Sequence, residues 1–187
     1  MFPRCLLGGI WLLVLLISGC NARKWDYEPL AISGTSSDVK LIKIEPKIER
    51  LGRGEFAVSG RIEWNFETTN ETMVEAFVYR SQTGEESDYK GLPWTIPKQT
   101  LYEHMDTFYK DVSMKNFKHC SNFPQFTEKF QPPLPKKIYV GDKCMIDGDG
   151  LPDIIPPGYY KVIVKGFGPN QPTWGGTGIF KITTKIF

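Results

Sequence analysis

The sequence predicts a mainly β domain with one short helix. Several segments alternate between apolar and polar side chains with a period of two, which is typical of half-buried strands. Glycine, proline and asparagine separate these segments, and only one segment places apolar residues at helical spacing. The chain has 187 residues, so residues 23–187, which remain after loss of an N-terminal signal, suit a single domain.

The clearest strand is predicted at residues 55–68, EFAVSGRIEWNFET. One face of this strand is apolar, and we expect it to point inward, whereas the other face carries polar residues and Ala57. The apolar face consists of Phe56, Val58, Gly60, Ile62, Trp64 and Phe66.

Two further strands flank this one. A preceding strand at residues 39–51 places Ile42, Ile44 and Ile48 in phase, and Pro46 restricts it to an edge position or a bend. A following strand is predicted at residues 72–81, with a polar turn at residues 83–91.

The C-terminal region predicts a β-hairpin. Its strands lie at residues 158–168 and 178–187, and residues 169–177 join them, with Trp174 at the tip. We expect the inward faces of this hairpin to include Val162, Val164, Phe180 and Ile182.

One helix is predicted at residues 98–114, where Leu101, Met105, Phe108 and Val112 recur at helical spacing. Residues 116–144 follow, and their proline and phenylalanine content predicts an ordered loop that leads to Cys144.

The N-terminus has the layout of a secretory signal peptide at residues 1–22. A basic start at Arg4 precedes an apolar stretch, and small residues precede Arg23. The alternative is a bacterial lipoprotein site, because ISGC would place lipid on Cys20. A sequon at residues 70–72 predicts an N-glycan on Asn70, which agrees with a secreted, extracellular glycoprotein.

Loss of the signal peptide removes Cys5 and Cys20 and leaves Cys120 and Cys144. In an oxidising compartment these two thiols are expected to form a structural disulfide. The alternative is a catalytic Cys120 beside His119, but adjacent residues of a strand point to opposite faces.

The acidic stretch near the C-terminus has two interpretations. Asp147, Asp149 and Asp153 could bind calcium, but the helix-flanked calcium loop needs oxygen ligands where this chain has Leu151 and Gly158. The Asp, Gly and Pro residues fit turns better, so we predict no metal site.

The sequence offers little catalytic chemistry. It contains no hydrolase or metalloprotease motif, and His104 in the predicted helix is interpreted as a surface or boundary residue. Residues 174–178, WGGTG, precede a strand and lack the Lys-Ser/Thr ending of a phosphate loop. A net charge of +2 without a basic run argues against a nucleic-acid partner. We therefore predict a protein without catalytic residues or cofactor.

The many large apolar side chains fit an apolar ligand held between two sheets. A filled sandwich core would use the same phenylalanine, isoleucine and tryptophan residues, so these residues leave both interpretations open.

The strings CMIDGDGLPDIIPPGYYKVIVKGFG and PTWGGTGIFKI carry a family resemblance. They resemble the C-terminal half of the ganglioside activator protein and its insect relatives, the chemosensory B proteins of taste sensilla. The resemblance is best over residues 120–187 and looser around Trp64. It implies an immunoglobulin-like β-sandwich or β-cup whose apolar cavity holds an acyl chain or another hydrophobic molecule. Ganglioside activators contain several disulfides, whereas this chain has only Cys120 and Cys144, which favours the insect branch.

The function implied by the resemblance is non-enzymatic binding of a lipid or hydrophobic pheromone in contact or taste perception. Its partners would be the ligand, a sensory receptor or channel, and transiently a membrane surface. Trp64, Trp94, Phe167, Trp174 and Phe180 are our candidates for the cavity, although burial in a core explains each equally well. The alternatives are an extracellular adhesion or receptor-associated module with a filled core, and a helper that presents lipid to a hydrolase.

Overall fold

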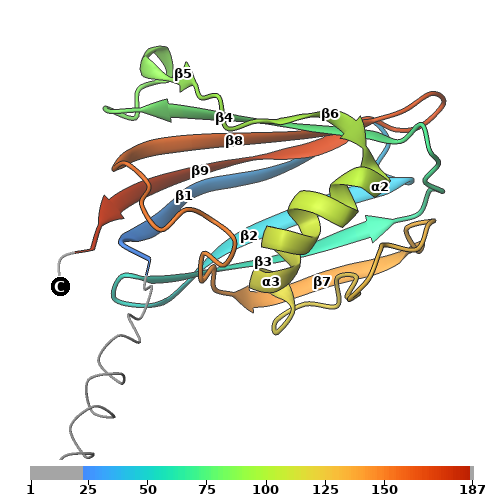
Figure 1. Cartoon of the computed structure of the whole chain (residues 1–187), viewed down its shortest axis with the longest axis horizontal. Helices are drawn as coiled ribbons and strands as arrows, with labels where there is room; N and C mark the ends of the chain where they lie inside the picture. Colours follow the sequence, from blue (N-terminus) through green and yellow to red (C-terminus); the bar gives the residue numbers. More distant parts are fainter. Residues whose placement is uncertain (1–22, 186–187) are drawn as a thin grey trace, which may run out of the picture.

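The computed structural model describes residues 23–185 and consists of two antiparallel sheets and one main helical segment (Figure 1). The predicted signal peptide, residues 1–22, lies outside the described residues. The larger sheet is six-stranded, with the order β1-β9-β8-β4-β5 and with β6 also paired to β4. The smaller sheet is three-stranded, with the order β2-β3-β7. The predicted mainly β, sandwich-like fold is therefore confirmed.

The strands are β1 (Trp25–Ser36), β2 (Ile42–Gly52), β3 (Glu55–Trp64), β4 (Met73–Ser81), β5 (Lys90–Gly91), β6 (Ile96–Thr100), β7 (Lys137–Cys144), β8 (Gly158–Phe167) and β9 (Trp174–Thr184). A short 3₁₀ turn, η2 (Glu86–Asp88), precedes β5.

The main helical segment confirms the helix predicted at residues 98–114. It runs without interruption through α2 (Leu101–His104), the π-helical stretch η3 (Met105–Ser113) and α3 (Met114–Phe117). A capping box starts it: Glu103 N–H donates to Thr100 Oγ1 (3.1 Å), and Thr100 N–H donates to Glu103 Oε2 (3.0 Å). The segment contacts β4 and β6 at one end and β7 at the other, and so lies across the strands (Figure 1). Within residues 23–185, no helix has the length and apolar character that crossing a membrane requires.

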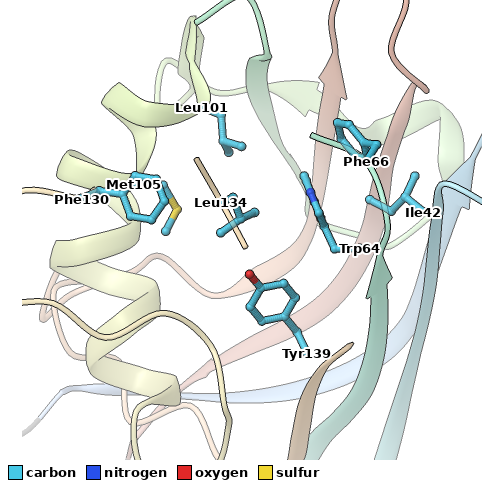
Figure 2. Close-up of a cluster of buried hydrophobic side chains, with 8 residues drawn as sticks. All are labelled: Ile42, Trp64, Phe66, Leu101, Met105, Phe130, Leu134 and Tyr139. Carbon is cyan, nitrogen blue, oxygen red and sulfur yellow. The ribbon is translucent and has the colours of Figure 1, made fainter. Parts of the chain in front are cut away.

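Figure 2 shows the main core, which lies between the smaller sheet, the helical segment and residues 118–136. Its buried members are Ile42, Trp64, Phe66, Leu101, Met105, Phe130, Leu134 and Tyr139. Ile42 on β2 is the cross-strand neighbour of Trp64 on β3, so the alternation seen in the sequence directs both side chains into this core.

Ala57 was predicted on the face of β3 opposite Phe56 and Val58. It is fully buried (0% exposed), whereas Phe56 and Val58 beside it are only partly buried. The pairing of β3 with β2 runs without a shift from Ala57 to Trp64, so the alternation of β3 is kept. The pairing between β3 and β7 shifts register, but from Cys144 to Gly141 the extra residue lies on β7.

A second, smaller core cluster lies on the larger sheet. It consists of Trp25 on β1, Tyr160 on β8 and Ile182 on β9, and Leu151 and Ile155 from the β7–β8 connection pack against it. Ile182 therefore points inward, as predicted.

The two sheets come into contact at β1 and β2. A Cβ atom at Gly34 on β1 would lie 2.3 Å from the backbone oxygen of Ile44 on β2. Only glycine fits this approach, which joins the two sheets along one side of the sandwich.

Several element boundaries differ from the predictions. β9 begins at Trp174, so Trp174 lies in a strand and the prediction that it forms the hairpin tip was wrong. Gly175, Gly176 and Gly178, which suggested a turn, belong to β9. β7 lies inside the predicted loop at residues 116–144, and β5 inside the predicted turn at residues 83–91. β1 was not anticipated.

The predicted disulfide between Cys120 and Cys144 is present, with an S–S distance of 2.07 Å. It joins the segment after α3 to the end of β7. The alternative of a catalytic Cys120 is thereby excluded, because the sulfur is bonded to Cys144.

The acidic stretch after β7 forms turns. Gly148 and Gly150 have φ angles of +87° and +80°, which glycine adopts without strain. The buried side chain of Asn116 fixes these turns: its Nδ2 donates to the Asp149 carbonyl (2.9 Å), and Gly148 N–H donates to its Oδ1 (2.8 Å). The β7–β8 connection is therefore attached to the helical segment.

Candidate functional site

The candidate site lies on the face of the larger sheet that points toward the smaller sheet and the helical segment. Cross-strand pairs there join β4 to β8 and β8 to β9. The middle of this face consists of Val78, Val162, Val164, Gly176, Gly178 and Phe180, which we call the inner strip. Every member of the inner strip is only partly buried, whereas Ala76, which lies on the same face opposite Val164, is 3% exposed.

The exposure of the inner strip is unusual for its position. Along β8, the buried residues are Tyr160 near one end and Gly166 near the other, whereas Val162 and Val164 between them keep some solvent exposure. The two core clusters lie toward opposite ends of this sheet, with Trp174 packed against one and Tyr160 belonging to the other. The apolar side chains between the clusters are therefore not fully covered by either core.

The helical segment carries several aromatic side chains. Tyr102 and Tyr109 pack against the main core, and their hydroxyls donate to the carbonyls of Thr68 (2.8 Å) and Pro124 (2.7 Å). His104 and Phe108 lie one turn apart, with ring centroids 5.9 Å from each other. Phe108 is 38% exposed.

His104 is neutral in this environment. Burial lowers the pKa of His104 to about 4. Its Nδ1 is buried and has no hydrogen-bond partner within the described residues. The neutral imidazole therefore places a buried polar atom without a partner on the helical segment, next to Phe108.

Two tryptophans close one end of the inner strip. Trp64 on β3 and Trp174 on β9 meet edge to face, with centroids 5.0 Å apart. The Trp174 ring covers Gly166, since a Cβ atom there would lie 2.1 Å from the indole. Neither indole N–H has a partner among residues 23–185. The predicted cavity residues Trp64 and Trp174 are thus brought together.

An open pocket of about 440 Å³ adjoins Trp174 at this end of the sheet; we call it the end pocket. Its lining residues come from the β8–β9 hairpin and the β1–β2 turn, two segments that lie at the right in Figure 1. Its lining combines apolar rings with hydroxyl groups and one lysine. These residues are Thr35, Ser36, Ser37, Lys165, Gly166, Phe167, Thr173 and Trp174.

The remaining cavity candidates lie apart from each other. Phe167 lines the end pocket together with Trp174. Phe180 belongs to the inner strip, where its ring covers Gly178, since a Cβ atom at Gly178 would lie 2.6 Å from that ring. Trp94 lies between β5 and β6 and is 49% exposed, so it is not part of the Trp64–Trp174 contact.

The glycosylation candidate occupies a turn between β3 and β4. Asn70 is exposed, whereas Thr72 of the same sequon is fully buried. Thr72 Oγ1 accepts a hydrogen bond from Thr69 N–H (2.8 Å) and donates one to Gln171 Oε1 (2.9 Å). The acceptor asparagine is therefore accessible in the folded chain, and the threonine has a structural role.

A second pocket, of about 420 Å³, lies at the other end of the strands. Arg23, Asp26, Tyr27, Glu55 and Asp147 are among its lining residues. Arg23 is already engaged there, because it pairs with Asp26 at 3.5 Å and lies over the Trp25 ring. This pocket is more polar than the inner strip and is separate from the two tryptophans.

Sequence reasoning missed the hydroxyl groups of the end pocket. Ser36 and Ser37 lie at the end of β1 and just after it, and Thr173 precedes β9, so they are distant in the sequence. The antiparallel pairing of Ser36 with Trp174 brings them together. Single serines and threonines in turns carry no signal that distinguishes them from ordinary turn residues.

The fold and this site define a two-sheet β protein with a helix laid across it and an apolar inner strip that its own cores cover only in part. A family described as "Protein of unknown function (DUF1091)" matches residues 74–162. The match spans β4, the helical segment, the disulfide and β7, and it ends inside β8. It overlaps the region of the resemblance between residues 120 and 162. A comparison with curated proteins finds no similar sequence.

Proposed function

We propose that this chain is a secreted, non-enzymatic protein that binds a lipid or another hydrophobic small molecule on the inner strip. The observation that carries the proposal is the partial exposure of Val162 and Val164 in the middle of a central strand. Filled protein interiors are close-packed, and the middle of a central strand is where a filled sandwich is most buried. An apolar ligand would complete the burial that these side chains lack.

The composition of the site supports binding in preference to catalysis. The strip offers valine, glycine and phenylalanine, and His104 on the helical segment has a pKa lowered to about 4 by burial. Such a histidine has little capacity to accept a proton near neutral pH. The protein would hold its ligand unchanged and without a cofactor.

The resemblance to the chemosensory B proteins supports a narrower role in the perception of contact pheromones or taste. In that role the protein would carry the hydrophobic ligand through an extracellular fluid and pass it to a sensory receptor or channel. Contact with a membrane surface would be transient. Secretion is supported by the signal-peptide pattern at residues 1–22 and by the accessible sequon asparagine, Asn70.

Native mass spectrometry of the protein secreted from eukaryotic cells tests the proposal. We expect one fatty acid, lipid or long hydrocarbon per chain, identified after organic extraction, and no hydrolysis product of an added lipid. A ligand-free mass, together with no uptake of a fluorescent lipid probe, would overturn the proposal. That result would favour an adhesion or receptor-associated module that acts through its outer surface.

A further inference from the structure

We propose that Trp64 and Trp174, at one end of the inner strip, donate hydrogen bonds to an oxygen atom of the ligand. The ligand is then an uncharged molecule with a long apolar chain and a carbonyl group, such as an ester or a ketone. This inference rests on the proposed function and narrows its ligand class. Plain hydrocarbons and ionised fatty acids would be poorer ligands than an ester or ketone of the same chain length.

The first argument is a pair of buried donors without an acceptor. The indole Nε1 atoms of Trp64 and Trp174 are buried, and neither has a hydrogen-bond partner within residues 23–185. An indole N–H can only donate, and nearly all buried donors in proteins are paired because an unpaired one is costly. Trp25 shows the ordinary case, since its Nε1 donates to the Pro152 carbonyl (2.8 Å).

The second argument is the position of these donors on the inner face. The atom of Trp174 nearest to a Cβ built on Gly166 is Cε2, at 2.1 Å, and Cε2 is bonded to Nε1. The Trp174 nitrogen therefore lies over β8. The next cross-strand pair on the same face is Val164 with Gly176, about 7 Å further along the strands. An apolar chain on the inner strip thus ends beside this donor.

The third argument is the absence of an acceptor among the side chains drawn around Trp64. Figure 2 shows Trp64 within the main core, and of the eight side chains drawn only Tyr139 carries an oxygen. That hydroxyl is engaged elsewhere, because it donates to the Pro135 carbonyl (2.7 Å). Phe66 stacks on Trp64 with ring centroids 4.7 Å apart. An oxygen for these donors would therefore come from the ligand.

The fourth argument is the charge of the site. The inner strip contains no ionisable side chain, because strand alternation directs Lys161, Lys165 and Glu75 to the opposite face of the larger sheet. Removing an ionised carboxylate from water without a charged partner costs far more than removing a carbonyl oxygen. The acceptor that fits the two indoles is therefore an uncharged one.

The first test compares ligands that share one chain length and differ in the polar group. A long-chain alkane, the corresponding methyl ketone and the corresponding fatty acid compete with a fluorescent lipid probe for the secreted protein at pH 8. We expect the ketone to bind on the order of tenfold more tightly than the alkane, as for a net gain of one or two hydrogen bonds. The ionised fatty acid should bind more weakly than the ketone.

The hydrogen bonds themselves are observed by nuclear magnetic resonance of protein labelled with ¹⁵N at its tryptophans. We expect the ketone to move the indole N–H signals of Trp64 and Trp174 downfield, and the alkane to cause no such shift. The Trp25 signal is the internal control, because its N–H is already bonded to Pro152. This readout uses the wild type, so it does not depend on the folding of a variant.

The matched variants are Trp174→Phe and Trp94→Phe. Trp94 is 49% exposed and lies between β5 and β6, away from the two indoles. We expect Trp174→Phe to reduce the preference for the ketone and Trp94→Phe to keep it. Equal affinity for ketone and alkane with unmoved indole signals would overturn the inference and leave apolar binding intact. No binding of the probe or of any of these ligands would contradict the proposed function itself.

Discussion

Replacing Val164 by phenylalanine tests whether the inner strip has free space or belongs to a filled core. Val164 is only partly buried, and its cross-strand neighbours on the inner face are Ala76 and Gly176. These neighbours offer a methyl group and a hydrogen atom, so a phenylalanine ring has lateral space. Because the strip keeps solvent exposure, we expect the free energy of unfolding to change by less than about 0.5 kcal/mol, as at sites that are not tightly packed.

The matched control is Val74→Phe on the same face of the same sheet. Val74 is 2% exposed, and its neighbour Gly166 lies under the Trp174 ring, which occupies the adjacent space. A larger side chain in such a packed position costs about 1–3 kcal/mol. The two variants therefore introduce the same ring at positions whose packing differs.

Urea unfolding measures the stability of both variants, and titration with a fluorescent lipid probe measures their affinity. We expect Val164→Phe to weaken lipid binding by at least about tenfold, or about 1.4 kcal/mol, since the ring takes the place of the ligand. If Val164→Phe destabilises the protein as much as Val74→Phe and leaves probe binding unchanged, the strip is part of a filled core and the reasoning fails.

Further predictions concern stability and modification. Replacing Cys120 and Cys144 together by serine should cost about 3 kcal/mol in urea unfolding, because their bond spans a sequence separation of 24; a loss below about 1 kcal/mol would contradict the loop-entropy argument. Burial lowers the pKa of His104 to about 4, so the unfolded chain takes up a proton as the pH falls through about 6.5 and the folded chain does not. Stability should be full above pH 6.5 and fall by up to about 3 kcal/mol by pH 4, and His104→Gln should remove this slope; the same slope in the variant would show that other groups cause it. Thr72→Ala should cost about 1–3 kcal/mol, because Thr72 is fully buried and hydrogen-bonded, whereas Asn70→Gln should cost less than about 0.5 kcal/mol. Both changes should abolish the mass shift on enzymatic deglycosylation, and equal losses of stability would refute the structural role of Thr72.

The strands that were predicted well from the sequence alternate regularly between apolar and polar residues, because one face of each is buried and the other faces solvent. In β3, Trp64 is buried against the helical segment while Glu63 and Arg61 form an exposed ion pair on the opposite face (3.2 Å). β7 was missed because its outward side chains include Ile138 and Val140, which are 42% and 40% exposed. Apolar residues on both faces remove the alternation, and the preceding prolines then predict a loop.

Trp174 shows why a glycine-rich strand is mistaken for a turn. Gly175 and Gly176 suggested a tip, but each has a neighbouring backbone where a side chain would be: a Cβ atom would lie 2.0 Å from the Val164 oxygen and 2.7 Å from the Ser33 oxygen. Glycine is needed there for close approach within a central strand, and not for a reversal. Only the register of β9 with β1 and β8, which is a long-range property, distinguishes the two cases.

The candidate site, like the strands, could be predicted from the sequence only in part. Trp64, Phe167 and Trp174 could be named as candidates because tryptophan and phenylalanine side chains are large and conspicuous in a sequence. The serines that complete the end pocket were not, because Ser36 reaches Trp174 only through strand pairing across most of the chain. Pockets formed at the meeting point of distant turns depend on register, and register is set by the whole hydrophobic pattern and not by the local residues.

The position of the helical segment explains why the inner strip is covered only in part. Leu101 and Met105 belong to the core on the smaller sheet, so the most buried side of the helix is committed there. Tyr102 and Tyr109 add hydrogen bonds to Thr68 and Pro124, and Asn116 attaches α3 to the β7–β8 connection. Moving the helix onto the strip would break these contacts and expose part of the main core. In the proposed function, we therefore expect the ligand to enter beside the helix while the helix remains in place.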